Sequence, residues 1–193
     1  MTKGRRPFEP LGSEAVHYAY AANSTVAGEV ERGTAGLTLS LPVTRTRVVV
    51  GKFLSLVPGV VLVNAITFLA VVLGVELVDE SIDVTHLFAV HAYSIGYLLA
   101  CAGVGLLASV AFDSVRRAQT IGAGSVFGLF LLDTFTFDTD YEWLGDVTFS
   151  RHFDPGAILV DGEISWPDLS VLLIAVVVLV VVSGEYFERR DLS

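Results

Sequence analysis

The chain has 193 residues, of which 53% are hydrophobic and 17% charged, and its mean hydropathy is +0.66. A soluble domain of this length rarely carries so much apolar side chain, so the composition indicates a membrane protein. The net charge of -9 argues against nucleic-acid binding, which needs a basic face to displace counterions. Acid-rich composition with only Lys3 and Lys52 as lysines is also typical of proteins from a high-salt cytoplasm.

Residues 1 to 20 begin with basic residues but have no apolar stretch behind them, so we expect no cleaved signal peptide. Residues 27 to 52 then gather four of the twelve basic residues: Arg32, Arg45, Arg47 and Lys52. Gly33-Thr34 predicts a turn, Pro42 stops a short element, and Thr44 can cap the next helix, whose arginines would meet lipid headgroups. This region is predicted to lie on the membrane surface.

Two long apolar segments follow. Residues 53 to 75 contain no charge and cover roughly 30 Å as a helix, enough for one hydrocarbon core. Pro58-Gly59 is expected to bend this span, and Asn64 and Thr67 are polar groups that can hydrogen-bond across helices. Residues 87 to 112 form a second span, whose small residues favour close helix packing: Gly96, Ala100, Gly103 and Ala108.

The third and fourth spans are predicted at residues 118 to 137 and 168 to 187. Asp133 is the only charged residue of the third, and an aspartate in a span is tolerated mainly where it faces a cavity or a partner. It either lines a pathway, with Asn64 and Thr67 as further candidates, or lies at the interface near the end of the span. The fourth span is rich in Val, Leu and Ile, and a helix is favoured over a strand because three other spans surround it.

Charge placement predicts the orientation. Every Lys and Arg except Arg151 falls in residues 1 to 52, 113 to 117 or 185 to 193, which four spans place on one side of the membrane. By the positive-inside rule both termini are cytoplasmic. The outer loops, residues 76 to 86 and 138 to 167, are acidic. The second carries Trp143, Phe149 and Phe153, with Trp166 at its end, and is expected to lie partly along the interface.

Several sequence motifs resemble one known family. The stretch GEVERGTAGLTLSLPVTRTRVVVGKF is similar to the cytoplasmic coupling region of permease subunits of type 2 ABC exporters, and FDSVRRAQTIGAG, FSRHFDPGAILVDGEISWPDL and the ending YFERRDLS continue the resemblance. Within that family the chain looks closest to the permeases associated with nitrous oxide reductase maturation. The alternation of Leu37, Leu39, Leu41 and Val43 alone predicts a strand, so the short coupling helix, within residues 28 to 47, is implied only by the resemblance.

The resemblance implies an all-α permease of the plasma membrane that is coupled to a separate ATPase. Two permease subunits, expected as a homodimer, form the pathway, and each docks its coupling helix into a separate ABC ATPase subunit that uses the ATP. This chain is then no enzyme and binds no cofactor directly. The residues that match the docking motif are Glu29, Glu31, Gly33, Thr34, Leu37, Leu39, Ser40, Leu41, Pro42, Arg45 and Lys52.

Family permeases usually have six spans, and the resemblance starts where the second should be ending, at HYAYAANSTVAGE. The chain is therefore expected to correspond to the last four spans, with residues 1 to 52 and 188 to 193 cytoplasmic. A truncated form, a wrongly assigned start and a half that needs a companion polypeptide all fit this. A non-transporting membrane assembly factor or a permease remnant is the alternative function.

Motifs for other chemistry are weak. The sequence has no G-x-x-x-x-G-K-[ST] phosphate loop, so any ATPase activity must belong to another chain. His86 and His91 are five residues apart, off the spacing that places two ligands on one helical face, so no metal site is expected. No G-x-S-x-G motif marks a hydrolase nucleophile, and a membrane enzyme using His91 or Asp133 ranks third.

Overall fold

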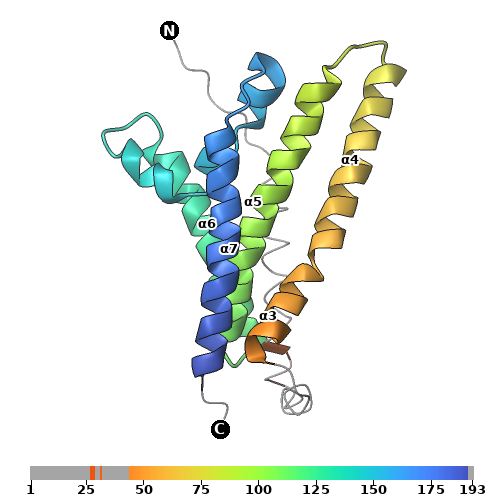
Figure 1. The fold of residues 1–193 in the computed structure, drawn as a ribbon. Helices are drawn as coiled ribbons and strands as arrows, with labels where there is room; N and C mark the ends of the chain where they lie inside the picture. Colours follow the sequence, from red (N-terminus) through yellow and green to blue (C-terminus); the bar gives the residue numbers. More distant parts are fainter. Residues whose placement is uncertain (1–26, 29–30, 32–43, 191–193) are drawn as a thin grey trace.

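The computed structural model describes residues 27–28, 31 and 44–190, and in these residues it contains helices and no strand. The elements are α3 (Arg45–Leu54), α4 (Val57–Leu77), α5 (Val84–Ala111), α6 (Val115–Thr136), η1 (Glu142–Val147), η2 (Ser150–His152), η3 (Ala157–Asp161) and α7 (Trp166–Arg189). The long helices form a bundle from which α4 diverges at one end, and toward that end lie short helical turns, some of which project to one side (Figure 1).

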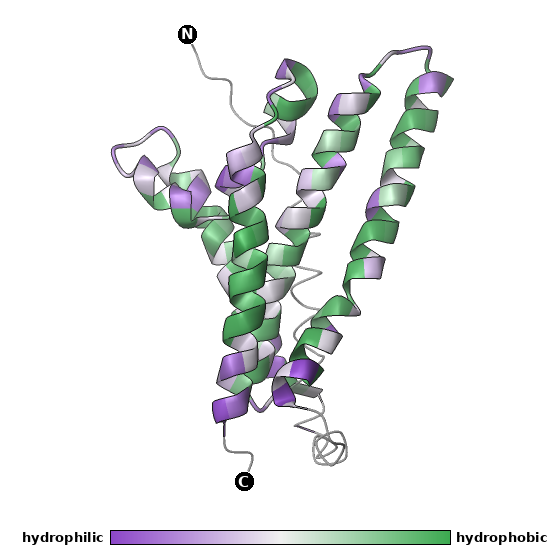
Figure 2. Cartoon of the chain, in the orientation of Figure 1, coloured by the Kyte–Doolittle hydropathy of each residue, from purple (hydrophilic) through white to green (hydrophobic). Residues whose placement is uncertain are grey.

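Four segments are long and apolar enough to cross a bilayer: α3 with α4 as one run from Arg45 to Leu77, α5, α6 and α7. Figure 2 shows apolar residues along their middles and hydrophilic residues gathered near their ends. The prediction of an all-helical membrane protein with four spans is confirmed. We call the end with α3, Arg116, Arg117 and the C-terminus of α7 the basic end, and the end with η1, η2 and η3 the acidic end.

Helix α5 is the centre of the bundle. In its most apolar stretch 72% of the residues are buried within the chain, against 11% for the α3–α4 run. Its glycines permit this: a Cβ at Gly103 would lie 3.0 Å from Leu179, and one at Gly96 would lie 3.6 Å from Leu172, both on α7. The small residues of the second span therefore serve close packing, as predicted.

The start of the first span differs from the expected residue 53. Helix α3 begins at Arg45, and the side chain of Thr44 caps it by accepting a hydrogen bond from the Arg47 amide at 3.4 Å, as predicted. The helix is interrupted at Ser55 and Leu56, and α4 begins with Pro58 in its first turn. Proline is well placed there because the first amides of a helix have no partner within it, so the chain breaks just before Pro58.

The other three spans begin and end within three residues of the predicted positions. Asp83 caps α5 by accepting hydrogen bonds from the amides of Thr85 and His86, which explains why that helix starts earlier than residue 87. Pro167 occupies the first turn of α7. Caps and prolines thus set ends that hydropathy alone leaves open.

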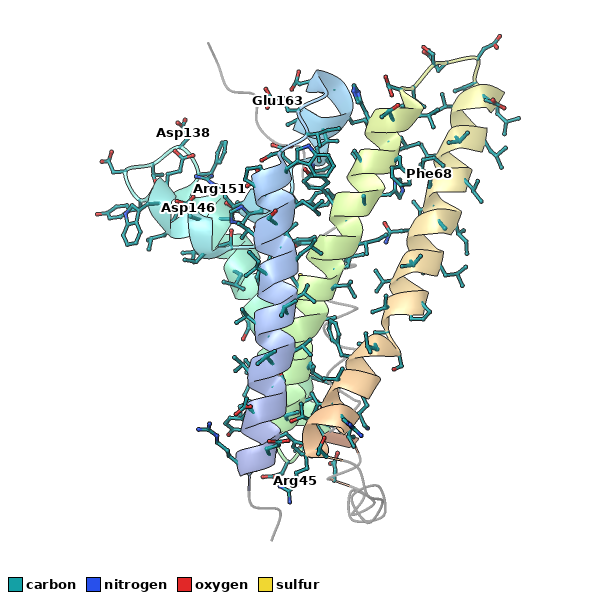
Figure 3. The ribbon with its side chains drawn as sticks, viewed as in Figure 1. Arg45, Phe68, Asp138, Asp146, Arg151 and Glu163 are labelled. Carbon is teal, nitrogen blue, oxygen red and sulfur yellow. The ribbon has the colours of Figure 1, made fainter. Side chains whose placement is uncertain are left out.

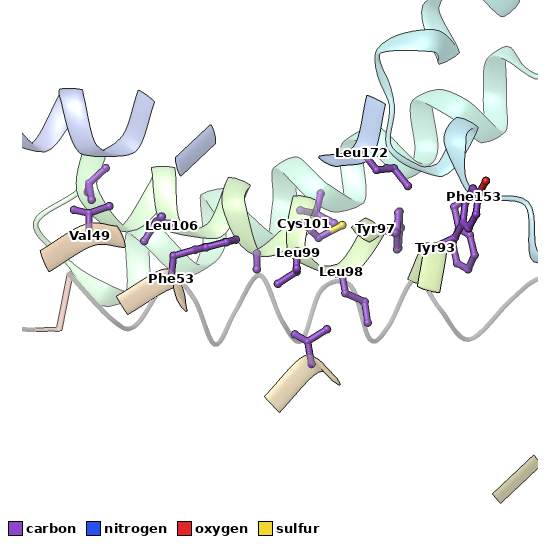
Figure 4. Close-up of a cluster of buried hydrophobic side chains, with 14 of the residues drawn as sticks. Val49, Phe53, Tyr93, Tyr97, Leu98, Leu99, Cys101, Leu106, Phe153 and Leu172 are labelled. Atoms are coloured by element: carbon purple, nitrogen blue, oxygen red, sulfur yellow. The ribbon is translucent and has the colours of Figure 1, made fainter. Parts of the chain in front are cut away.

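The acidic end is closed by residues 138 to 165. Phe153 is buried against Tyr97 of α5, with ring centroids 5.6 Å apart, and the Tyr93 hydroxyl donates to the Ser165 carbonyl at 2.7 Å. Figure 4 shows Tyr93, Tyr97 and Phe153 together at one end of the buried cluster that also contains Cys101. Phe153 is therefore a core residue, whereas Trp143 and Trp166 are exposed.

Candidate functional site

The basic end is where the predicted ATPase-coupling segment joins the bundle. Helix α3 lies there with Val49 and Phe53 buried in the core cluster and Arg47 exposed. Residues four apart share one face of a helix, so α3 turns an apolar face to the bundle and keeps a charge in solvent. This makes α3 a surface helix packed mainly against the end of α7.

Arg45 binds the C-terminal end of α7. Its Nη1 donates to the carbonyl of Arg190 at 2.5 Å and to that of Phe187 at 3.4 Å, and its guanidinium carbon lies 5.8 Å from the centroid of the Phe187 ring. The last carbonyls of a helix have no partner within it and carry the negative end of the helix dipole. An arginine at this position gives these carbonyls a hydrogen-bond donor and places a positive charge at the negative end of the dipole. Arg45 thereby joins the start of α3 to the end of α7.

One turn earlier on α7, the two helices touch at Gly184. A Cβ there would lie 2.9 Å from Cγ2 of Thr46, closer than real side chains approach. The Thr46 hydroxyl also donates to a carboxylate oxygen of Glu188 at 2.6 Å. Glycine is thus required by a close approach between helices rather than by its backbone conformation.

Arg190 extends these contacts to α5 and α6. Its guanidinium donates to the carbonyl of Val110, near the end of α5, and pairs with Asp113 in the turn before α6. Only 13% of the Arg190 side chain is exposed, whereas 79% of Asp113 is. Since Arg45 binds the carbonyl of this same residue, the two arginines connect α3, α7 and the α5–α6 turn in series. We call Arg45, Asp113, Gly184 and Arg190 the basic-end junction.

Glu31 of the coupling segment and Ala27 just before it also touch this region. The Ala27 amide donates to the buried Ser109 hydroxyl of α5 at 2.9 Å. A carboxylate oxygen of Glu31 accepts from the amide of Val115, the first residue of α6, at 3.2 Å. A carboxylate is favourable at a helix N-terminus because free amides and the positive end of the dipole meet there.

Three residues of the predicted docking set can be located. Glu31 contacts α6, Arg45 contacts α7, and Lys52 is half-buried in the last turn of α3. The others lie outside the described residues: Glu29, Gly33, Thr34, Leu37, Leu39, Ser40, Leu41 and Pro42. Contact with an ATPase stays a prediction for all of them. The Arg45 guanidinium already donates hydrogen bonds to carbonyls of its own chain.

Sequence reasoning did not single out Arg190 and Asp113. Arg190 counted toward the positive-inside rule and belongs to the ending YFERRDLS, and Asp113 belongs to the motif FDSVRRAQTIGAG, both of which carry the family resemblance. A faint signal was available, since an arginine just past an apolar span and an aspartate beside the turn of another lie at the same membrane depth. Many pairs share that property, so the sequence alone does not select this one.

The three pathway candidates do not come together. Asn64 is buried on α4 and donates to the Val60 carbonyl at 3.0 Å, while the exposed Thr67 donates to Val63 at 2.9 Å. Both hydrogen bonds lie within α4. Asp133 lies on α6 against η1, one turn from the end of the helix. A pathway role stays a prediction for all three.

Asp133 belongs to a charged cluster around Arg151. The guanidinium lies 2.7 Å from Glu142, 3.6 Å from Asp146 and 3.8 Å from Asp133, and it also donates to the Glu142 carbonyl. Oδ1 of Asp133 is buried without a hydrogen-bond donor, and the Arg151 guanidinium 3.8 Å away compensates its charge. The cluster holds η1 against the last turn of α6.

The two histidines considered as metal ligands make other contacts in the structure. Nδ1 of His91 lies 2.9 Å from the Leu87 carbonyl of its own helix, and the His86 ring packs against Gly162. Within residues 27–28, 31 and 44–190, no group of three or more His, Cys, Asp or Glu side chains is arranged to hold a metal ion.

Comparison with known proteins gives one match. The model of a family described as ABC-2 family transporter protein matches residues 16–192, which is nearly the whole chain. No curated protein matches the chain, and no solved structure does either.

Proposed function

Since the chain belongs to the ABC-2 transporter family and is a multi-pass permease of an ATP-binding cassette transporter, we propose that it works as a homodimer driven by a separate ATPase subunit. In this proposal the permease lies in the plasma membrane with its basic end in the cytoplasm. The distribution of Lys and Arg supports that orientation. ATP is bound and hydrolysed by the partner subunit alone.

Residues 28 to 47 are the proposed ATPase contact. The order of a Glu-rich stretch, a Gly-Thr pair, a Leu-rich piece and a Pro resembles the coupling region of type 2 ABC exporter permeases, and this resemblance supports the assignment. The capped start of α3 supports it too, because Thr44 and Arg45 fix the point where the segment enters the bundle. A force applied to the segment therefore acts on a defined helix end.

The observation that carries the proposal is the basic-end junction. Arg45 joins α3 to α7, Arg190 joins α7 to the α5–α6 turn, and Glu31 contacts the first amide of α6. A displacement of the coupling segment thereby reaches α5, α6 and α7 through side-chain contacts at the basic end. Rigid-body movement of packed helices is a common form of such transitions.

Co-purification tests the docking step. The full chain is expressed with the ATPase subunit encoded beside it, and retention of that subunit is measured for the wild type and for the double variant Glu31→Ala, Gly33→Ala. The matched control is Gly74→Ala, Glu76→Ala, which removes the same two residue types with the same spacing at the acidic end, where a Cβ at Gly74 meets nothing. We expect the first variant to lose at least about tenfold in affinity, or 1.4 kcal/mol, and the control to bind normally.

Equal retention of the ATPase by the two double variants would remove residues 28 to 47 from the docking surface. The dimer is tested separately by measuring the mass of the purified permease in detergent. A monomeric mass in the ATPase-bound complex would contradict the homodimer.

A further inference from the structure

Exposed aromatic and apolar side chains lie at the acidic end, on η1 and just before it. Trp143 and Val147 are each 65% exposed and Tyr141 is 64% exposed, whereas Gly145 and Thr148 are buried. Gly145 and Thr148 are three residues apart, one turn of a 3₁₀-helix, so they face the same side. The segment therefore turns one face to the bundle and a different, aromatic one outward.

Helix α6 fixes the depth of η1 in the membrane. A Cβ at Gly145 would lie 3.1 Å from Oδ1 of Asp133 and 3.4 Å from the Thr136 hydroxyl, so η1 sits against the last turn of α6. No charged residue occurs between Arg117 and Asp133, a distance of about 24 Å along a helix, which spans most of a hydrocarbon core. Asp133, and η1 with it, thus marks one edge of that core.

Helix α7 gives the same depth independently. The His152 ring lies 2.8 Å from Oδ1 of Asp168, in the first turn of α7, and 3.1 Å from the carbonyl of Asp146 in η1. No charged residue occurs between Asp168 and Glu185, a distance of about 25 Å. Two spans therefore place η1 at one boundary between hydrocarbon and water.

The carboxylates of η1 are paired with Arg151, which follows η1 in the chain. Arg151 pairs with Glu142 and Asp146, the two carboxylates that flank Trp143 in η1. Uncompensated carboxylates are costly near hydrocarbon, and pairing lowers that cost. Figure 3 shows Asp146 and Arg151 in the segment that projects to one side of the bundle, away from α4.

We propose that η1 is an interfacial anchor, in which Trp143 and Tyr141 insert between the lipid headgroups at the acidic end. Tryptophan and tyrosine are enriched at this depth because their rings are apolar and their N–H or O–H groups still reach polar partners. The partner is the lipid surface itself, and the anchor holds the outer end of α6 at a fixed depth. The proposal needs only a membrane-embedded chain and is independent of ATPase coupling.

Tryptophan fluorescence tests the anchor because the chain has only two tryptophans. The variant Trp166→Phe leaves Trp143 as the single reporter in the full-length protein, reconstituted into phosphatidylcholine vesicles. Quenching is measured with lipids brominated near the headgroup, with lipids brominated near the chain end, and with aqueous iodide. We expect Trp143 to be quenched most by the shallow bromines and weakly by the other two.

The matched control is Trp143→Phe, in which Trp166 at the start of α7 reports the same boundary on a transmembrane helix. Strong iodide quenching of Trp143 with no effect of brominated lipids would overturn the proposal, because the segment would then stand in water. Protection from both quenchers would overturn it too, since a second copy of the chain would then cover the patch. Each variant is first checked for a wild-type elution volume and Tm in detergent.

Discussion

Arginines stabilise both ends of the bundle, but at the basic end they join long helices to one another, whereas at the acidic end Arg151 joins a short segment to a helix. At the basic end Arg190 contacts Val110 and Asp113, 80 and 77 residues away in the chain, and so connects one span to two others. At the acidic end the partner of Arg151 that lies farthest from it in the chain is Asp133, so Arg151 joins a short segment to a single span. The first end holds helices together, whereas the second holds a cap in place.

The largest effect is expected from filling the close approach between α3 and α7. Gly184→Leu places a side chain where Thr46 already lies, and overpacking of this kind costs about 2 to 3 kcal/mol of unfolding free energy. Thermal unfolding of the purified protein in detergent measures it. The control is Gly128→Leu on α6, where a Cβ meets nothing within 4 Å. Equal losses in Tm would show that the basic end is not tightly packed.

A smaller but clear loss is expected at the acidic end. Arg151→Gln leaves the buried Asp133 carboxylate without its cation, at a cost of about 2 kcal/mol because the other two carboxylates can turn to solvent. Adding Asp133→Asn should restore part of the Tm by removing the unpaired charge.

The control for Arg151 is Arg189→Gln. Arg189 is 82% exposed and pairs with Glu185 one turn away, so its loss should change stability by no more than about 0.5 kcal/mol. If Arg189→Gln proved as damaging as Arg151→Gln, burial of the cluster would not explain its contribution.

A weaker coupling is expected between Arg190 and Asp113. Asp113 is 79% exposed, so solvent screens the pair, and a double-mutant cycle with alanine should give about 0.5 to 1 kcal/mol. Arg190→Ala alone should cost more than Asp113→Ala, because it also removes the donor to the Val110 carbonyl. The reverse order in Tm would contradict a link from α7 to the end of α5.

The smallest effect concerns pH and is confined to the acidic end. Hydrogen bonds from the amides of His86 and Thr85 hold the pKa of Asp83, just before α5, below its ordinary value of 3.8. The lowered pKa means that the ionised cap stabilises the folded state above about pH 3.8 and loses this contribution as pH falls below it.

Asp83→Asn keeps a capping side chain but does not titrate. The Tm of the wild type should therefore fall relative to that of this variant as pH is lowered from 6 to 3. A constant difference across that range would mean that Asp83 does not act as an ionised cap.

Much of the fold could be predicted because it depends on local properties of the chain. Apolar runs of membrane length marked the four spans, Thr44 marked the start of α3, and Pro58 marked the break before α4. Each of these signals involves neighbouring residues.

The contacts between helices could not be predicted in the same way. Arg190 and Asp113 are far apart in the chain, and the residues around each of them do not indicate that the two side chains meet. Asn64 and Thr67 of α4 can hydrogen-bond across helices, but in the structure each donates to the backbone carbonyl four residues earlier in its own helix. Local partners competed successfully with distant ones.

The buried position of Cys101 has a practical consequence for work on this protein. It is the only cysteine of the chain and lies enclosed within α5, so a thiol-reactive reagent should leave the natural protein unmodified. A cysteine introduced at Ser114, and another at Ser193, can therefore be modified selectively without first removing Cys101. A maleimide that cannot cross membranes then reports which side of the cell membrane each position faces, and the two should give the same answer.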